Sequence, residues 1–142
     1  MLYLESLNIA MFDLMKDDSV VLIGEDLLDP YGGAFKVSKG LSTSFPKQVI
    51  STPISEQAIT GAAVGMAMRG MKPIVEIMFG DFITLCVDQI VNHASKFKGM
   101  YNNQVSVPIV IRSPMGGGRG YGPYYNELQA LSESQEALKL EK

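Results

Sequence analysis

The chain has 142 residues, of which 46% are hydrophobic and 19% are charged. This length suits one compact domain and is too short for a single-chain enzyme of two or more domains, and the apolar content excludes disorder of the whole chain. Lys and Arg number 12 against 15 Asp and Glu, which gives a net charge of −3. Without a basic surplus to attract a phosphate backbone, the composition argues against nucleic acid as a partner.

Cys86 is the only cysteine, so the chain cannot form an internal disulfide and suits a reducing compartment. The apolar runs fall far short of the ~20 residues that a membrane span requires. The first 15 residues contain Glu5 and Asp13 and lack the basic start and cleavage site of a signal peptide. The sequence therefore predicts a soluble, cytoplasmic protein.

Hydrophobic periodicity predicts helices that alternate with short strands. Apolar residues recur at helical spacing over residues 4–14, whereas residues 20–23 form the unbroken apolar run of a strand covered on both faces. Strands that alternate with helices indicate an α/β fold, with one parallel sheet and helices on both faces. The later pattern predicts a helical patch at 37–41 and a strand from 49 that stops at Pro53. An N-cap at Ser55 then precedes a helix over 57–68, which is followed by a strand over 74–78 and a helix over 82–97. After a turn at Asn102-Asn103, the pattern predicts a strand over 107–111 and a short terminal helix with Leu128, Leu131 and Leu138.

Two of these helices carry unusual residues. Gly61 and Gly65 lie four apart, so one helix face lets another backbone approach closely, either for packing on the sheet or for proximity to a ligand. The apolar stripe of the helix over 82–97 includes His93 and Cys86. We expect His93 to be a packed or interface residue and Cys86 to be core, and no Cys/His cluster has metal-binding spacing.

Ligands of parallel α/β folds bind beyond the carboxyl ends of the strands. Glu56 lies there, in the first turn of a helix, where the helix dipole favours an acid. The alternative is that, in a dry site, its carboxyl shares a proton with a ring nitrogen. The other strand ends carry Glu25, Ser55, Arg112 and the aromatic pair Phe79 and Phe82.

Glu25 and Glu76 are acids at the end of, and inside, hydrophobic strands, where an unpaired charge is costly. Each needs a partner or a proton. Arg69, Lys72 or Arg112 could supply the partner, and for Glu76 we favour such pairing over catalysis.

Residues 116–122 contain five glycines in seven positions, so their backbone amides could face an anion with Arg119 as counter-charge. No Gly-Lys-Ser/Thr follows, so this is not a Walker loop. A mobile active-site flap and an inert loop both fit the composition.

Seven strings follow one another in a fixed order: GED at 24–26, YGGAFKV at 31–37, TPISE at 52–56, GAAVG at 61–65, PIVE at 73–76, DQIVN at 88–92 and GGGRGYGP at 116–123. In this order, over residues 2–123, the chain resembles the β subunits of thiamine diphosphate-dependent 2-oxo acid dehydrogenases of the pyruvate, branched-chain and acetoin types. The resemblance implies a transketolase-like, pyrimidine-binding domain over residues 1–142 that is incomplete at its C-terminus, with 124–142 as a divergent tail.

The resemblance also implies roles for five residues. In that family the acid at the position of Glu56 hydrogen-bonds a ring nitrogen of the aminopyrimidine, and this favours the tautomer whose exocyclic nitrogen accepts the thiazolium proton. Phe82 lies against the pyrimidine ring, and Ile54 and Met78 line its pocket. Glu25 matches an acid on a polar path between two active sites. Glu56 is thus the implied catalytic residue, and all five bind the cofactor.

The resemblance implies several partners as well. The family holds the diphosphate and its Mg²⁺ through a Gly-Asp-Gly motif on another domain, and this chain has none. The implied assembly is a heterotetramer with an E1 α subunit and a second β copy. It decarboxylates a 2-oxo acid oxidatively and passes the acyl group to a lipoyl-bearing E2 component.

Two features depart from the family. Where the family has Thr-His-Ser-Gln after Pro123, this chain reads Tyr124-Tyr125-Asn126-Glu127, so the family's active-site histidine is absent. Residues 128–142 no longer follow the family, and a β subunit truncated there would leave a sheet edge unprotected. Three functions stay open: an E1 subunit active with its α partner, a catalytically inactive truncated homologue that acts in assembly, and a stand-alone domain that binds a small anion.

Overall fold

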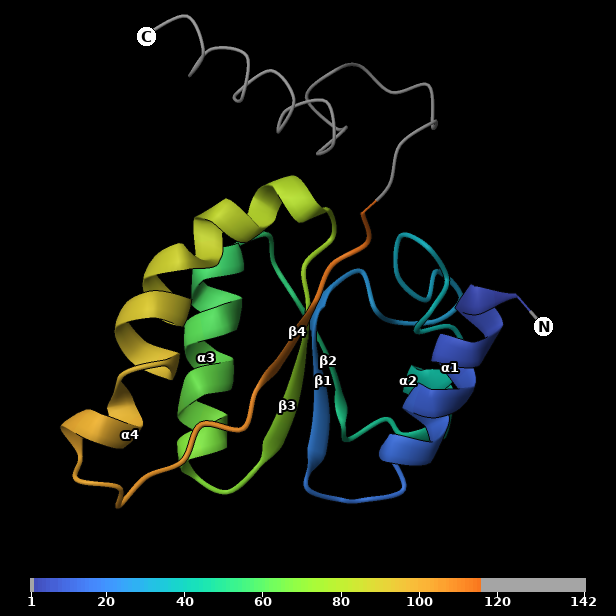
Figure 1. Ribbon diagram of the computed structural model, residues 1–142. Helices are drawn as coiled ribbons and strands as arrows, with labels where there is room; N and C mark the ends of the chain where they lie inside the picture. Colours follow the sequence, from blue (N-terminus) through green and yellow to red (C-terminus); the bar gives the residue numbers. More distant parts are fainter. Residues whose placement is uncertain (1, 116–142) are drawn as a thin grey trace, which may run out of the picture.

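The computed structural model describes residues 2–115, which form a sheet between two layers of helices. The elements are, in chain order, α1 (Tyr3–Leu14), β1 (Val20–Glu25), α2 (Leu41–Ser44), β2 (Val49–Thr52), α3 (Glu56–Met68), β3 (Lys72–Glu76), the 3-10 helix η1 (Gly80–Cys86), the π-helix η2 (Gln89–Ala94), α4 (Phe97–Met100) and β4 (Val110–Arg112). The four strands are parallel and follow the order β2-β1-β3-β4. Figure 1 shows α1 and α2 on one face of the sheet and α3, η1, η2 and α4 on the other. The predicted fold class is confirmed.

Side chains of the strands alternate between the two faces and so build two separate hydrophobic cores. Because both faces of β1 are covered, its sequence is a continuous apolar run up to Ile23. The core on the α1 side consists of Met11, Met15, Val20, Leu22, Leu27, Val37, Leu41, Val49 and Ile74. The core on the α3 side consists of Ile23, Ile59, Ala63, Val75, Ile77 and Cys86.

α1 begins and ends close to its predicted limits, and polar contacts fix its first turn and the turn that follows the helix. The Glu5 carboxylate accepts a hydrogen bond from the Leu2 N–H at 2.9 Å in the first turn. Beyond the helix, the Asp17 carboxylate accepts hydrogen bonds from the Ser19 N–H at 2.9 Å and from the Ser19 hydroxyl at 2.6 Å. The predicted turn at residues 17–19 therefore leads directly into β1.

The helical patch predicted at 37–41 forms later in the chain, as α2. The Asp29 carboxylate accepts hydrogen bonds from the Gly40 N–H at 2.8 Å and from the hydroxyls of Ser42 at 2.8 Å and Thr43 at 2.6 Å. These bonds satisfy donors at the start of α2 and hold the pKa of Asp29 well below its ordinary value. The prediction placed the helix too early because the residue that fixes its start lies 11 positions before Gly40.

β2 and α3 lie close to their predicted positions. β2 ends at Thr52, directly before Pro53, and α3 begins at Glu56. Ser55 holds the N-cap position, and its carbonyl accepts the Ile59 N–H at 2.9 Å, but its hydroxyl makes no capping hydrogen bond. The predicted N-cap is thus right in position and wrong in its side-chain role.

β3 begins two residues before the predicted strand and includes Pro73, which the sequence had placed outside the sheet. The Lys72 N–H donates to the Ser19 carbonyl at 2.7 Å, toward β1. Because successive residues of a strand alternate, the Pro73 nitrogen faces the other side, where β4 pairs only from Ile74 onward. The proline therefore costs the sheet no hydrogen bond.

The helix predicted over 82–97 is a continuous helical stretch whose hydrogen-bond spacing changes along its length. η1 is a 3-10 helix, and in η2 the Ser95 N–H donates to the Ile90 carbonyl, five residues earlier, at 3.0 Å. Cys86 is buried as predicted, whereas Leu85 of the predicted apolar stripe is exposed. A single α-helical period was therefore the wrong description of this segment.

The close approach predicted at Gly61 and Gly65 occurs only at Gly61. A Cβ atom on Gly61 would lie 3.2 Å from Oε1 of Gln89, whereas one on Gly65 would have no neighbour within 4 Å. The approaching group is a side chain of η2 and not a backbone. Packing of α3 against η2 accounts for Gly61 and also explains the polar Gln89 in the apolar stripe.

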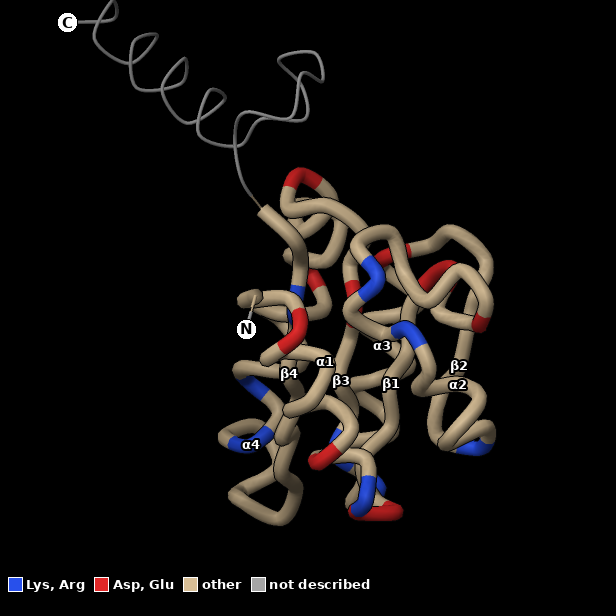
Figure 2. Tube along the Cα trace, turned by 90° about the vertical axis from the view of Figure 1, so that its right-hand side faces the viewer, with Lys and Arg blue, Asp and Glu red and all other residues tan. Residues whose placement is uncertain are grey.

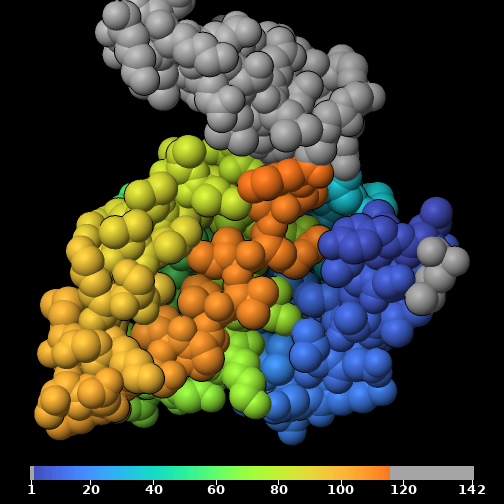
Figure 3. All heavy atoms as spheres, in the orientation of Figure 1, coloured from blue at the N-terminus to red at the C-terminus, as the bar shows by residue number. Residues whose placement is uncertain are grey.

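β4 is shorter than the predicted strand over 107–111. Before it, Asn102 and Asn103 adopt left-handed φ angles of 50° and 61°, which confirms the predicted turn. Among residues 2–115, β4 is an edge strand, and Figure 3 shows it at the surface between α1 and the helical stretch. The glycine-rich stretch 116–123 and the terminal helix predicted around 128–138 lie outside the described residues.

α3 has 13 residues, against the ~20 that a membrane span needs. Within residues 2–115, no helix combines the length and the apolar character required to cross a bilayer.

Replacing the fully buried Leu22 by Ala should lower the free energy of unfolding by about 2–5 kcal/mol, because it leaves a cavity in the core on the α1 side. Leu28→Ala is the matched control, since Leu28 is 51% exposed and the same change there should cost less than about 1 kcal/mol. Urea unfolding followed by circular dichroism measures both variants. Equal losses would contradict the burial of Leu22 between the sheet and α1.

Candidate active site

The carboxyl ends of the strands meet at one edge of the sheet, which is the upper edge in Figure 1. β1 ends at Glu25, in register with Thr52 at the end of β2, and Glu76 at the end of β3 is in register with Arg112 of β4. Gly24 lets β1 and β3 approach closely here, since a Cβ atom would lie 2.5 Å from the Glu76 carbonyl oxygen. In Figure 2, most acidic positions lie in the upper half, toward this edge. The edge is where parallel α/β folds bind ligands.

Glu56 begins α3 at this edge and is only 7% exposed. Its backbone carbonyl accepts hydrogen bonds from the Thr60 hydroxyl at 2.8 Å and from the Cys86 thiol at 3.6 Å, so the first turn of α3 is tied to η1. Among residues 2–115, its carboxylate accepts no hydrogen bond and forms no ion pair. A largely buried residue whose carboxylate oxygens have no protein partner is well placed to accept a hydrogen bond from a bound ligand.

Glu25 is buried near Glu56, and its pKa lies above the ordinary value of 4.5. Burial is the largest cause, and the negative charges of Glu56 and Asp26 add to it. Within the described part of the chain, no Lys or Arg forms an ion pair with Glu25. Of the two alternatives that the sequence left open, a cationic partner for Glu25 is absent among residues 2–115, and the direction of its pKa shift favours the protonated form.

Glu76 has the cationic partner that the sequence analysis favoured. Its Oε2 atom accepts a hydrogen bond from Nη1 of Arg112, in a largely buried ion pair, and one from the Ser38 hydroxyl at 3.4 Å. Burial raises the pKa of Glu76, while Arg112 and Ser38 oppose this rise. Lys72, another of the candidate partners, is the first residue of β3, at the end opposite Glu76. Its ammonium group pairs with the Asp17 carboxylate at 2.8 Å.

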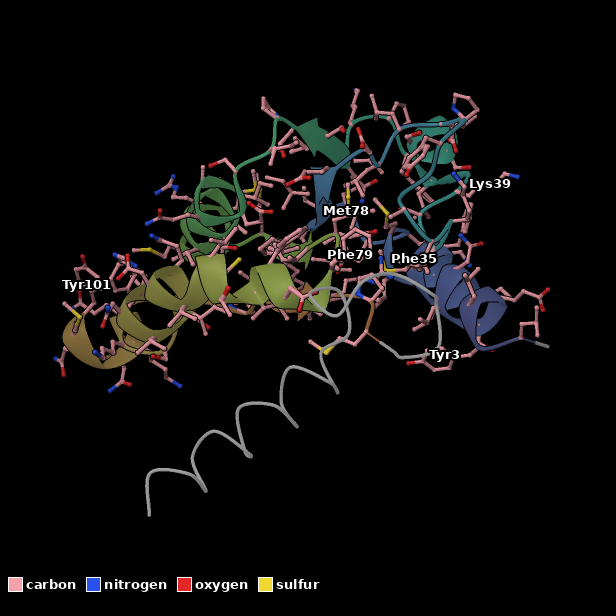
Figure 4. All side chains as sticks on the ribbon, turned by 90° about the horizontal axis from the view of Figure 1, so that it is seen from above. Tyr3, Phe35, Lys39, Met78, Phe79 and Tyr101 are labelled. Atoms are coloured by element: carbon pink, nitrogen blue, oxygen red, sulfur yellow. The ribbon has the colours of Figure 1, made fainter. Side chains whose placement is uncertain are left out.

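Three phenylalanines form a chain of edge-to-face contacts at the same edge. The Phe79 ring centroid lies 5.7 Å from that of Phe35 and 5.8 Å from that of Phe82, with the ring planes at 85° and 90°. Phe79 and Phe82 follow β3, whereas Phe35 comes from the loop after β1. Figure 4 shows Phe35, Phe79 and Met78 close together in the view onto this edge. Met78 and Phe82 are both half-buried.

Ile54 differs from the other predicted site residues because its side chain is 80% exposed. It lies in the turn between β2 and α3, two residues before Glu56. The structure therefore brings Glu25, Glu56, Met78 and Phe82 to one edge of the sheet, and it leaves Ile54 in solvent beside them.

A cleft of about 630 Å³ opens beside this edge, between the start of α1, the loop after β1 and the end of β4. Arg112 and Phe35 contribute to its walls, together with Tyr3, Ser113 and Met115. None of the five predicted site residues lines this cleft. It adjoins the Glu76–Arg112 pair and the aromatic chain, and does not open onto Glu56.

His93 is half-buried in η2 and packs edge-on against Phe97, with ring centroids 5.2 Å apart. Its Nδ1 atom is 4.0 Å from Oδ2 of Asp88. Cys86 is fully buried. The packing of His93 and the burial of Cys86 agree with the expected packing roles. Between residues 2 and 115, no group of three or more His, Cys, Asp or Glu side chains could hold a metal ion.

The sequence analysis missed Phe35 as a candidate site residue. It singled out Phe79 and Phe82 because they follow a predicted strand directly. The available signal for Phe35 was an aromatic residue in a glycine-containing loop that follows an acid at a strand end. Its partner ring could not be inferred from the sequence, because 44 positions separate Phe35 from Phe79.

We expect the stability of the chain to fall as the pH rises from the ordinary pKa of Glu25 through its raised value in the folded state. In this range the folded state binds more protons than the unfolded state, so deprotonation favours unfolding. Glu25→Gln removes this contribution, so its free energy of unfolding relative to the wild type should increase between about pH 4 and about pH 7. Urea unfolding at both pH values measures the effect.

Glu76 contributes a decline of the same sign, which the Glu25→Gln variant retains. Asp18→Asn is the control, because Asp18 is exposed in the turn before β1, far from the carboxyl ends. A decline in Glu25→Gln as steep as that of the wild type would contradict the raised pKa.

Comparisons with known proteins agree with the α/β fold. Residues 3–124 match the model of the family described as the transketolase, pyrimidine binding domain. The chain is 41% identical over 143 residues to the 2-oxoisovalerate dehydrogenase subunit beta of Bacillus subtilis (strain 168), covering 99% of this chain and 43% of that protein. It is 43% identical over 128 residues to the mitochondrial pyruvate dehydrogenase E1 component subunit beta-2 of Oryza sativa subsp. japonica, covering 89% of this chain and 34% of that protein.

A third relative is the acetoin:2,6-dichlorophenolindophenol oxidoreductase subunit beta of Cupriavidus necator, 41% identical over 115 residues, which cover 75% of this chain and 34% of that protein. The chain thus spans less than half the length of each of these relatives. Because the family match covers most of the sequence and the sheet has the expected parallel topology, the chain belongs to the transketolase pyrimidine-binding domain family and is homologous to the N-terminal part of 2-oxo acid dehydrogenase E1 beta subunits.

Proposed function

We propose that the chain is a β-type subunit, or part of one, of a 2-oxo acid dehydrogenase E1 component. With an α partner it activates thiamine diphosphate for the oxidative decarboxylation of a 2-oxo acid, and the acyl group passes to a lipoyl carrier. The observation that carries this proposal is Glu56, a buried carboxylate without a partner among residues 2–115, at the ligand-binding edge of the sheet. We also infer that residues 1–142 are one pyrimidine-binding domain, of which 124–142 diverge.

The residues at this edge fit the pyrimidine half of thiamine diphosphate. When bound, that cofactor supplies a carbon nucleophile and an electron sink. Glu56 would share a proton between its carboxyl and a ring nitrogen of the aminopyrimidine. This contact would give the largely buried side chain a hydrogen-bond partner. Phe82 and Met78 would give the ring apolar contacts, and Glu25 would begin a polar path from the site.

We propose that the diphosphate half is bound by a second polypeptide. The sequence has no Gly-Asp-Gly motif, and the described residues contain no acid cluster for Mg²⁺. Ile54, exposed beside Glu56, supports a pocket wall that is completed from outside. We propose an E1 α subunit as this partner, in a heterotetramer with a second β copy that delivers its product to a lipoyl-bearing E2 component.

A second candidate function is a catalytically inactive homologue that acts in assembly. Tyr124-Tyr125-Asn126-Glu127 stands where the family has its active-site histidine, and this sequence feature favours the second candidate. Both candidates require binding to an α subunit, and only the first requires turnover.

Glu56→Gln tests the role of the buried acid in the chain combined with an E1 α subunit, thiamine diphosphate, Mg²⁺ and a 2-oxo acid. Release of carbon dioxide should fall by about 10²–10⁴-fold, because an amide cannot share the proton at the ring nitrogen. Asp13→Asn, an exposed acid at the far end of α1, should leave the rate unchanged.

Equal activity of wild type and Glu56→Gln would refute the role of Glu56. No activity in the wild type would refute the enzymatic function of this chain and leave the assembly function standing.

Ile54→Asp tests the partner-completed pocket. If the α subunit covers Ile54, a charge there becomes buried on association, and co-purification with that subunit should weaken by about tenfold or more. Leu28→Asp is the matched control, since Leu28 is exposed in the loop after β1 and should tolerate the same change. Undiminished co-purification of Ile54→Asp would show that the partner does not cover this side chain.

A further inference from the structure

Glu76 is the only one of the three buried acids at the strand ends of residues 2–115 with an ion-pair partner, and the proposed chemistry assigns it no task. Its Oε2 atom accepts from Arg112 of β4 and from Ser38 of the loop after β1. The side chain therefore joins three segments at one point: β3, β4 and the loop after β1.

The loop wraps closely around this acid. A Cβ atom on Gly33 would lie 2.9 Å from Oε1 of Glu76 and 2.5 Å from the hydroxyl oxygen of Ser38, and Gly33 has a φ of +77°. Only glycine fits such a position without strain. The Gly33 N–H donates to the Asp26 carbonyl at 2.9 Å, and the Lys36 N–H donates to the Gly33 carbonyl at 3.1 Å. The segment is thus tied to Asp26, just after β1, at Gly33 and to the Glu76 carboxylate at Ser38.

Phe35 lies in the middle of this segment, and its ring meets the Phe79 ring edge to face. Phe79 in turn meets Phe82. The two contacts link the loop after β1 to the residue that the proposed function places against the aminopyrimidine. Displacement of the loop would remove one side of the support of Phe79 and so change the position of Phe82.

We propose that Glu76, held by Arg112, is a positioning residue, which anchors residues 33–38 through Ser38 and thereby, through Phe35 and Phe79, sets the position of the Phe82 ring. This inference rests on the proposed function only in that Phe82 contacts the pyrimidine. The anchoring itself is a property of the chain without any ligand.

Glu76→Gln in the full chain tests the inference, because it leaves Arg112 without its charge partner and weakens the anchor. Backbone amide exchange of Gly33 and Lys36 should become about tenfold faster or more, and the NMR signals of the Phe82 ring protons should shift. Affinity for 4-amino-5-hydroxymethyl-2-methylpyrimidine, the pyrimidine half of thiamine, should fall about fivefold to tenfold.

Asp17→Asn is the matched control, because it breaks the other ion pair of β3, with Lys72, at the opposite end of the strand. It should leave the amide exchange of Gly33 and Lys36 and the Phe82 ring signals unchanged.

Ser38→Ala is a milder second variant that keeps the ion pair, and it decides the question if Glu76→Gln does not fold. It should change the same signals in the same direction.

Unchanged exchange at Gly33 and Lys36, or unchanged Phe82 ring signals, in a folded Glu76→Gln or Ser38→Ala variant would overturn the inference. Loss of stability without these local changes would show a merely structural role and would overturn the inference equally.

Phe82→Ala separates the inference from the proposed function. If that change leaves affinity for the pyrimidine intact, the proposed ring contact fails, whereas the exchange and ring signals still decide the anchoring by Glu76.

Discussion

The burial of three carboxylates at one edge of an otherwise apolar sheet is the constraint on which the rest of the structure depends. Each acid loses hydration, and the chain compensates each loss differently. Glu76 is paired with Arg112 and hydrogen-bonded by Ser38, whereas the pKa of Glu25 is raised, first by its burial and then by the neighbouring acids Glu56 and Asp26. The Glu56 carboxylate has no hydrogen-bond or ion-pair partner within residues 2–115, and we infer that a ligand supplies one. These differences distinguish Glu76, which is paired within the chain, from Glu25 and Glu56, which the proposed function assigns to the cofactor site.

The fold could be predicted because burial on both faces leaves a clear trace in the sequence. The apolar run before Glu25 and the helical spacing of residues 4–14 identified the first strand and helix correctly. The errors occur where a distant contact decides the local structure. Asp29 fixes the start of α2 from across a loop. Pro73 has no N–H to donate, and it fits into β3 because β4 pairs with β3 only from Ile74 onward. No local pattern carries such information.

The location of the site could be predicted better than its contacts. Four of the five predicted residues gather at the strand ends because parallel strands all end at the same edge. The exposure of Ile54 could not be predicted, since it depends on what lies beyond the chain. Phe35 was missed because its neighbour Phe79 is distant in sequence. Spacing can indicate where side chains emerge, but it does not determine which rings touch across two loops.

Gly24 has a consequence for how this edge could adapt to different molecules. A Cβ atom there would lie only 2.5 Å from the Glu76 carbonyl oxygen, so a side chain at position 24 would force β1 and β3 apart at the point where they carry Glu25 and Glu76. We expect differences in selectivity among related chains in the segments beyond the strands, 53–55 and 77–82, and not in the sheet.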